Sequence, residues 1–228
     1  MLTLILAESA LEPIPLEIAK NNSVKKQMHR NNKSLEYFLL DKSIHFDAMK
    51  NLKDKHKRGR PDLIHITLLN IIATPLYKND LVEIYVHTIN NNILRIHKNV
   101  RLPKSYSRFE LLISKLFREK IIEHENKKLI EILNTDLDGL VGKIKPDIII
   151  GLSSKGEIKE CKQIAKKLDE YDRPLLIIGG FPHGDFGQNT EKKFNEMYSI
   201  DKEQLESHIV CSRMLYEYEL NCIENKYT

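Results

Sequence analysis

Tryptophan is absent from this 228-residue chain, and cysteine occurs only three times, as Cys161, Cys211 and Cys222. An odd number of cysteines without a Cys-x-x-Cys spacing indicates neither a disulfide framework nor a zinc knuckle. This cysteine usage fits a reducing compartment, and we therefore expect a cytoplasmic protein.

Long hydrophobic runs are absent as well, since no apolar stretch approaches the roughly 20 residues needed to cross a bilayer. The apolar segment from Met1 to Ala7 lacks a basic leader and is followed at once by Glu8, so it indicates a first strand and not a signal peptide. We expect no membrane association. Hydrophobic residues make up 41% of the chain, which is enough for a globular core.

The common nucleotide-binding loops are missing too. The Gly-Leu-Val-Gly-Lys sequence at 139–143 is too short for a P-loop, and neither Gly151 nor Gly179 opens a Gly-x-Gly-x-x-Gly turn. His65 and His87 lie in apolar segments without ligands at metal-binding spacing, so we expect core histidines with satisfied ring nitrogens and no metal site. A bound cofactor would need an unusual arrangement of residues.

A glycine-rich loop (residues 178–187) follows an apolar run and is the most informative stretch of the chain. It reads Ile-Gly-Gly-Phe-Pro-His-Gly-Asp-Phe-Gly. Glycine tolerates positive φ and allows a ligand to approach the backbone closely, which predicts a pocket lined by amide and carbonyl groups. A sharp turn at a strand end is an equally good interpretation of the composition alone. His183 is assigned no catalytic role, because a lone histidine more often packs or faces solvent.

The last third of the chain predicts an α/β fold. Asp147–Leu152 and Pro174–Gly179 are apolar runs, and Ser154–Asp169 has helical periodicity, with Ser154 and Glu157 as a capping box. This strand-helix-strand unit predicts parallel pairing of the two strands. Because ligands bind beyond the carboxyl ends of such strands, the segment after Leu152 should lie near the glycine-rich loop.

Other elements are predicted from local patterns. They are strands at Leu2–Ala7 and Leu35–Leu40, a polar and basic insertion at Lys20–Lys33 between them, a helix that begins at Pro61, a hairpin of Leu81–Thr88 and Ile93–His97 joined by Asn90, Asn91 and Asn92, and a helix at Arg108–Ile122.

The final helix, predicted from Asp201 to about Ile223, is apolar nearly all round its axis and includes Met214 and Leu215. A helix that is apolar on all sides is buried on all sides. We therefore expect part of it to meet a second subunit.

Two segments concentrate cations. Arg58-Gly59-Arg60-Pro61-Asp62 offers two guanidinium groups and a carboxylate, although solvated arginines beside a helix-terminal carboxylate are favoured about two to one by composition alone. The segment Arg101–Phe109 carries three cations, Arg101, Lys104 and Arg108, with Tyr106 and Phe109 interleaved among them. This pattern suits phosphate contact by the cations and base stacking by the two aromatic residues. A surface loop explains that second segment about equally well.

These motifs together resemble one family in their order and approximate spacing over nearly the whole chain. It is the ribosome-biogenesis family of small-subunit rRNA pseudouridine N1-methyltransferases, known as the "essential for mitotic growth" proteins, of the trefoil-knotted SPOUT class. The absence of a long leader is similar to the shorter archaeal members. The motifs that carry the resemblance are Ser9-Ala10-Leu11-Glu12, Arg58 to His65, Pro75-Leu76, Tyr85 to Thr88, Arg101 to Phe109, Ile178 to Gly184 and Tyr198-Ser199-Ile200.

The resemblance implies a SPOUT-type α/β fold with a parallel sheet, a C-terminal trefoil knot and family-specific insertions. It implies one domain over residues 1–228, with basic insertions around 20–33 and 42–60, that forms a homodimer. The implied cofactor is S-adenosylmethionine. Its binding residues would be Leu152, Gly179, Gly180, Gly184, Tyr198, Ser199, Ile200, Asp201, Lys202 and Glu203.

The resemblance also implies an RNA-binding and catalytic surface. Arg60, Arg101, Lys104 and Arg108 match rRNA-contacting positions, and Asp62 and Arg60 match the catalytic ones. Lys104 stands where an arginine is common, and lysine lacks the bidentate fork of a guanidinium. Asp62 is the best candidate for a base that accepts the N1 proton. An Arg60–Asp62 ion pair that shapes the site is the somewhat better-supported alternative.

The sequence thus leads us to expect an S-adenosylmethionine-dependent enzyme that methylates N1 of a pseudouridine in small-subunit rRNA during ribosome biogenesis. Ribosomal or assembly proteins are further candidate partners. One alternative is a non-catalytic rRNA-binding assembly factor, and another is a SPOUT methyltransferase of transfer RNA. A bulky β-branched residue at Gly184 should abolish cofactor binding, because a Cβ would intrude where the backbone meets the ligand.

Overall fold

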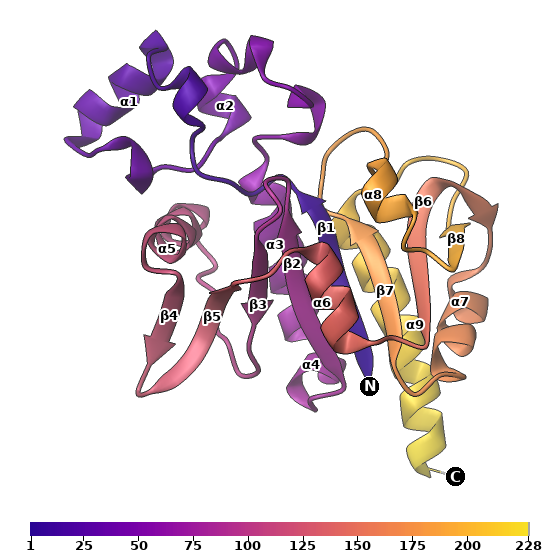
Figure 1. Cartoon of the computed structure of the whole chain (residues 1–228). Helices are drawn as coiled ribbons and strands as arrows, with labels where there is room; N and C mark the ends of the chain where they lie inside the picture. Colours follow the sequence, from indigo (N-terminus) through magenta and orange to yellow (C-terminus); the bar gives the residue numbers. More distant parts are fainter. Residues whose placement is uncertain (228) are drawn as a thin grey trace.

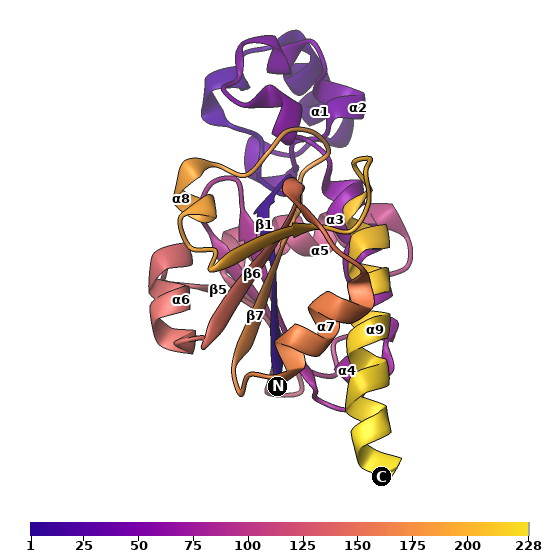
Figure 2. The same cartoon turned by 90° about the vertical axis from the view of Figure 1, so that its right-hand side faces the viewer.

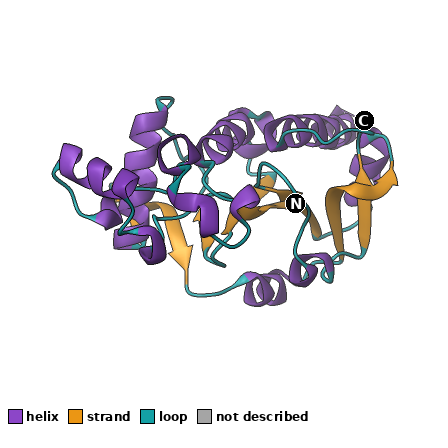
Figure 3. Cartoon of the chain, turned by 90° about the horizontal axis from the view of Figure 1, so that it is seen from above, coloured by secondary structure: helices purple, strands orange, loops and turns teal. Residues whose placement is uncertain are grey.

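The structure is a computed structural model that describes residues 1–227, with side chains described through residue 222. One eight-stranded sheet crosses this part of the chain in the order β4-β5-β3-β2-β1-β7-β6-β8 (Figure 1). Helices cover both faces of the sheet (Figures 2 and 3). The strands are β1 (Leu2–Ser9), β2 (Val82–Thr88), β3 (Ile93–Ile96), β4 (Ile121–His124), β5 (Lys127–Leu133), β6 (Ile148–Ile158), β7 (Pro174–Gly179) and β8 (Glu196–Ser199).

The helices within residues 10–60 stand together beyond one end of the sheet, and the later helices lie along the sheet (Figure 1). The α-helices are α1 (Asn22–Asn31), α2 (Lys42–His45), α3 (Pro61–Ala73), α4 (Pro75–Lys78), α5 (Tyr106–Glu119), α6 (Leu137–Ile144), α7 (Cys161–Asp169), α8 (Gln188–Glu191) and α9 (Ser207–Tyr227). The 3₁₀ helices are η1 (Leu16–Ile18), η2 (Leu35–Tyr37), η3 (Ala48–Asn51) and η4 (Lys55–Lys57).

The sheet is parallel in one part and antiparallel in the other. Strands β2, β1, β7, β6 and β8 pair in parallel, whereas β2–β3, β3–β5 and β4–β5 are antiparallel pairs. The predicted α/β class and the hairpin around Asn91 are confirmed, but the parallel sheet accounts for only part of the strands. The β4–β5 pair escaped prediction; its turn places Glu125 and Asn126 at positive φ, as a tight hairpin requires.

Strand β1 lies in the middle of the sheet and is buried over its whole length. Leu2, Leu4 and Leu6 face a core shared with α3 and α9, and Ile5 and Ala7 face a second core on the side of α6. A strand covered on both faces needs apolar residues at successive positions, which explains the uninterrupted run. The predicted first strand is therefore confirmed.

Strand β6 is longer than predicted, and the helix after it begins later. The strand continues to Ile158, which pairs with Ser199 of β8, and α7 begins only at Cys161. The capping box is made by Glu160 and Gln163, so the expected Ser154–Glu157 box was wrong. Pairing with β8, distant in sequence, decided the conformation of this ambiguous stretch. The parallel pairing of β6 with β7 is confirmed.

Three other predicted boundaries were wrong. The segment at 35–40 is a 3₁₀ helix followed by a single bridge between Leu39 and Pro13. Helix α5 ends before Lys120, whose positive φ turns the chain into β4. The last helix begins at Ser207 and not at Asp201. The predicted start of α3 at Pro61 is confirmed.

Residues 10–60, which we call the helical insertion, stand beyond the carboxyl end of β1 (Figure 1). They have a small core of their own, made by Ile14, Ile18, Val24, Phe38, Leu40, Ala48, Met49 and Leu52. Both predicted basic stretches lie in this insertion, which therefore holds cations near the ends of the parallel strands. The implied trefoil knot stays a prediction.

Candidate functional site

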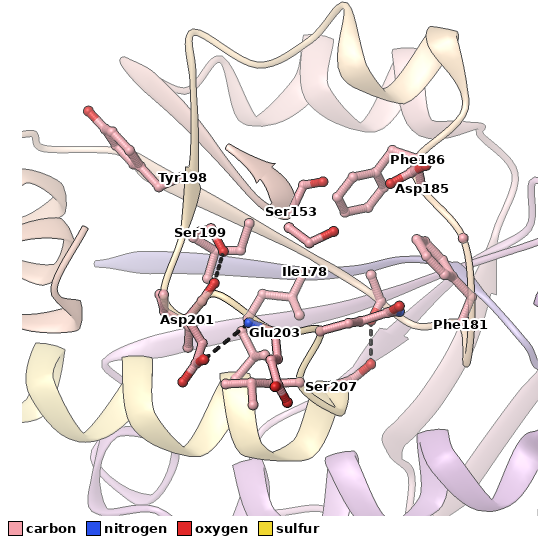
Figure 4. Close-up of a pocket in the computed structure, with 18 residues that line it drawn as sticks. Ser153, Ile178, Phe181, Asp185, Phe186, Tyr198, Ser199, Asp201, Glu203 and Ser207 are labelled. Carbon is pink, nitrogen blue, oxygen red and sulfur yellow. Dashed lines mark hydrogen bonds between the residues drawn. The ribbon is translucent and has the colours of Figure 1, made fainter. Parts of the chain in front are cut away.

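A pocket opens beyond the carboxyl ends of β7 and β8 and beside the middle of β6, where the pairing of β6 with β7 ends at Leu152 (Figure 4). The segment after Leu152 and the glycine-rich loop both line it, so their predicted proximity is confirmed. Of the expected cofactor residues, the lining includes Leu152, Gly179, Gly184, Tyr198, Ser199, Ile200, Asp201 and Glu203. Gly180 and Lys202 are not among the lining residues.

The wall of the pocket combines apolar and polar groups. Ile178, Phe181 and Phe186 form apolar surface, and carboxylates come from Asp201 and Glu203. Apolar and aromatic walls suit a nucleobase, and carboxylates suit ribose hydroxyls and positive charge. These residues fit S-adenosylmethionine, an amphipathic molecule that carries a sulfonium and an ammonium group.

The turn after β8 is held by its own hydrogen bonds. Ser199 donates its hydroxyl to the carbonyl oxygen of Asp201 at 2.6 Å, and the amide of Glu203 donates to a carboxylate oxygen of Asp201 at 3.2 Å. At the start of α9, Ser207 donates to the carbonyl oxygen of Gly179. The side chain of Tyr198 points away from the pocket (Figure 4), so only its backbone can contribute to the lining.

Two glycines of the loop allow close contacts within the protein. At Gly180 a Cβ would lie 2.1 Å from the Ser9 hydroxyl oxygen, so this glycine allows β1 and the loop to approach. Gly184 has φ of +99°, and a Cβ there would lie 2.9 Å from the His56 ring. A side chain at Gly184 would therefore clash with the helical insertion, and the expected loss of cofactor binding stays a prediction.

The two arginines of the Arg-Gly-Arg-Pro-Asp motif have different environments. Arg58 is buried and donates two hydrogen bonds of 2.7 Å to Glu12, which raise its pKa. Arg60 is bonded to Asp62 at 2.9 Å, but both side chains are about two-fifths exposed, at 38% and 40%. Arg58 is thus a structural residue. The prediction that the arginines of this motif are solvated holds only for Arg60.

The segment that carries the other cations is anchored by its aromatic residues. Phe109 is fully buried and stacks on His65 with ring centroids 4.3 Å apart. Tyr106 donates its hydroxyl to Asp41 of the helical insertion at 2.6 Å. The expectation that these two rings stack on RNA bases was wrong for Phe109, and Tyr106 is already engaged by the protein. Burial and the Asp41 carboxylate raise the pKa of Tyr106 above its usual range, so it remains a neutral donor.

Arg101, Lys104 and Arg108 are exposed, and within the described part of the chain they make no ion pair or side-chain hydrogen bond. His65 connects this segment to α3 through a 2.7 Å hydrogen bond between its Nε2 and the carbonyl oxygen of Pro103. The structure therefore links the segment to α3, the helix that carries Asp62 in its first turn. We call Arg60, Arg101, Lys104 and Arg108 the basic surface.

Two buried ion pairs at the end of β1 were missed by sequence reasoning. Glu8 pairs with Lys57 at 2.6 Å, and Glu12 pairs with Arg58 and also accepts from Asn90 at 2.8 Å. The signal was two glutamates close to the end of an apolar strand, because carboxylates that become buried there require cationic or hydrogen-bonding partners. Nothing local in the sequence identifies those partners.

The predicted core histidines are confirmed. His65 and His87 are 4% and 6% exposed. The Nδ1 of His87 accepts from the amide of Glu8, and its Nε2 bonds to Asn91. Burial lowers the pKa of His87, which keeps the ring neutral. Among the side chains described, residues 1–222, no group of three or more His, Cys, Asp or Glu is arranged to hold a metal ion. No helix of the described chain has the length and hydropathy of a membrane span.

Comparison with known proteins gives one consistent result. The family model described as "EMG1/NEP1 methyltransferase" matches residues 4–219. A protein of Saccharolobus solfataricus named "Ribosomal RNA small subunit methyltransferase Nep1" is 42% identical over 214 residues, which cover 93% of this chain and 94% of that protein. The equally named protein of Thermococcus sibiricus is 38% identical over 219 residues, 96% and 98% of the two chains.

The fold has a close structural match. The crystal structure of Archaeoglobus fulgidus Nep1 bound to S-adenosylhomocysteine superimposes with a TM-score of 0.85 at 34% sequence identity. The match covers 96% of this chain and 97% of the other.

Proposed function

The chain belongs to the EMG1/NEP1 methyltransferase family, and on this premise we propose that it methylates small-subunit ribosomal RNA with S-adenosylmethionine as the methyl donor. The observation that carries the proposal is the position of the pocket. It lies at the carboxyl ends of parallel strands, where ligands bind in α/β sheets. The segment proposed to bind RNA, residues 101–109, is bonded through His65 to α3, the helix that carries Asp62.

The acceptor atom we propose is N1 of a pseudouridine. The carbon glycosidic bond of pseudouridine leaves N1 free and bearing a proton, which must leave when the methyl group arrives. When bound, S-adenosylmethionine supplies a methyl group on a sulfonium, an electrophile that needs no further activation. The protein's residues have to orient N1 toward that group and favour loss of its proton.

Arg60 and Asp62 are the residues we assign to this task. Asp62 receives three hydrogen bonds from Arg60, of 2.9, 3.2 and 2.9 Å, so its carboxylate is already well satisfied. This geometry supports the positioning role, in which the ion pair orients the target base. Direct proton abstraction by Asp62 would require that pair to open.

Cofactor contacts are proposed for the lining residues of the sequence prediction, made chiefly through their backbone. RNA contacts are proposed for the basic surface, whose unpaired cations at positions 101, 104 and 108 are available for phosphates. Lys104 contributes charge without the bidentate fork of an arginine. We propose the whole chain as one functional unit that works in the cytoplasm, together with ribosomal or assembly proteins.

A homodimer is part of the proposal, with the last helix still the proposed interface, but Met214 and Leu215 are not the residues of that helix that could meet a second subunit. Met214 and Leu215 are buried inside their own subunit, so lysine at either position would unfold the chain. Tyr216 on α9 is 60% exposed and is the better probe. Native protein should behave as a dimer in light scattering, and Tyr216→Lys should weaken association without loss of folding.

The proposed activity is tested with synthetic RNA hairpins. Isothermal titration should show binding of S-adenosylmethionine, and mass spectrometry should show one added methyl group on a small-subunit rRNA hairpin that contains pseudouridine. The same hairpin with uridine should remain unmodified, because its N1 bears the glycosidic bond. RNA binding without cofactor binding would favour the assembly-factor alternative. Methylation of transfer RNA alone would favour the alternative of a transfer RNA methyltransferase.

A further inference from the structure

The ion pair between Glu8 and Lys57 lies against the glycine-rich loop. The two charged atoms are 2.6 Å apart, and both side chains are only 10% exposed. Glu8 belongs to the end of β1, and Lys57 ends η4 in the helical insertion, 49 residues later. Folding therefore buries both charges at the junction of three separate segments.

Each partner contacts one end of the loop portion 181–187. A carboxylate oxygen of Glu8 accepts a 2.7 Å hydrogen bond from the amide of Gly187, and the Nζ of Lys57 lies 4.7 Å from the centre of the Phe181 ring. Between these two anchors, Gly184, Asp185 and Phe186 line the pocket. One buried ion pair thus holds both ends of the pocket-lining backbone.

The chemistry explains why charges occupy this position. A carboxylate forms a stronger hydrogen bond to a backbone amide than a neutral acceptor does. Burying that carboxylate is unfavourable unless a cation compensates it, and Lys57 supplies the cation while its ammonium also faces an aromatic ring.

We propose that Glu8, with Lys57, is a positioning residue for the cofactor, which holds residues 181–187 in the conformation that lines the pocket. This inference rests on the proposed function of the pocket. It assigns Glu8 no contact with the substrate or with the methyl group. Its effect should appear in cofactor affinity and in the Michaelis constant for the cofactor, and not in the rate at cofactor saturation.

Two double variants separate the hydrogen bond from the charge. Both Glu8→Gln with Lys57→Met and Glu8→Ala with Lys57→Met remove the two charges together, and methionine can still pack on Phe181. Only glutamine retains an oxygen that can accept from Gly187. Titration with S-adenosylhomocysteine should show about tenfold weaker binding for the alanine variant. The glutamine variant should bind within about threefold of the native chain.

A third double variant, Glu12→Gln with Arg58→Met, is the matched control. It removes an equally buried pair that does not touch the glycine-rich loop, so cofactor affinity should be retained whatever its effect on unfolding. Equal affinities of the alanine and glutamine variants would overturn the inference while leaving the proposed function intact. No binding of S-adenosylhomocysteine by the native chain would overturn both.

Discussion

The ion pairs at the end of β1 and the basic surface use the same residue types for opposite purposes. Glu12 is fully buried and bonded to Arg58. Arg60 is only two positions after Arg58 in the chain, but its side chain, paired with Asp62, is 38% exposed. In the first region the charges are committed to the fold. In the second they remain accessible to solvent and to a polyanion, and so the two regions should respond very differently to mutation.

Gly59 explains how two neighbouring arginines reach such different places. Its φ is +71°, and a Cβ there would lie 2.9 Å from the methyl group of Met49. The amide of Lys42 also donates to the carbonyl oxygen of Gly59 at 2.8 Å. The chain therefore turns sharply at Gly59, so that the Arg58 side chain bonds to Glu12 while Arg60 stands at the start of α3.

The largest effect should follow from breaking the buried pair on one side only. Glu12→Ala leaves the Arg58 guanidinium buried without its carboxylate, which should lower the free energy of unfolding by about 3–5 kcal/mol. Asp62→Ala, which breaks the exposed pair, should cost less than about 1 kcal/mol. Urea unfolding of the two variants measures the difference. Similar losses in both would mean that burial does not distinguish the two regions.

The next effect concerns the backbone of the glycine-rich loop. Gly184→Ala places a side chain at φ of +99° and against His56, which should cost about 1–3 kcal/mol of unfolding free energy or shift the loop. Binding of S-adenosylhomocysteine should weaken in either case. Gly142→Ala is the matched control, because a Cβ there meets nothing within 4 Å and the residue lies in α6. It should stabilise the chain slightly and leave binding unchanged.

Acidification should lower the free energy of unfolding through two buried histidines. His45 and His87 each accept a backbone amide with Nδ1, and burial lowers the pKa of both below the usual 6.5. Below about pH 6.5 the unfolded chain then binds more protons than the folded chain. The unfolding free energy should fall as pH drops from about 6.5 toward the lower folded-state pKa values, by at most about 1.4 kcal/mol per pH unit for each histidine, and should level off below them.

Urea unfolding between pH 7.5 and pH 5 measures this slope. His87→Asn keeps an acceptor near the position of Nδ1 and does not titrate, so it should flatten the pH dependence. An unchanged slope in that variant would contradict the assignment of the effect to His87.

The smallest effect on folding is expected at the basic surface. Alanine at Arg101, Lys104 or Arg108 should change stability by less than about 0.5 kcal/mol. Each substitution should reduce the salt slope of log K for a small-subunit rRNA hairpin by roughly 0.7. Arg60→Ala should also lower the methylation rate at saturating RNA, because the ion pair with Asp62 orients the target base. Wild-type RNA affinity and salt dependence in all four variants would exclude this surface as the RNA site.

Parts of the site could be predicted because their signals are local. The glycine-rich loop follows a strand directly. The rule that ligands lie beyond the ends of parallel strands correctly predicted that this loop lies near the segment after Leu152. Phe109 was misassigned because an aromatic residue among cations looks the same whether it faces RNA or packs on His65. Likewise, the stretch from Ser154 to Ile158 is compatible with helix or strand until β8 pairs with it.

Local sequence patterns were sufficient to predict the α/β class, the strands β1, β2, β3 and β7, the start of α3 at Pro61 and the location of the glycine-rich loop. These depend on hydrophobic periodicity and on the backbone preferences of glycine and proline, which act within a few residues. Long-range contacts in the folded protein determine that Glu8 meets Lys57 and that Arg58 is buried while Arg60 is partly exposed. Such pairings join residues more than forty positions apart, and the stability of a buried charge depends on the partner that the whole fold brings to it.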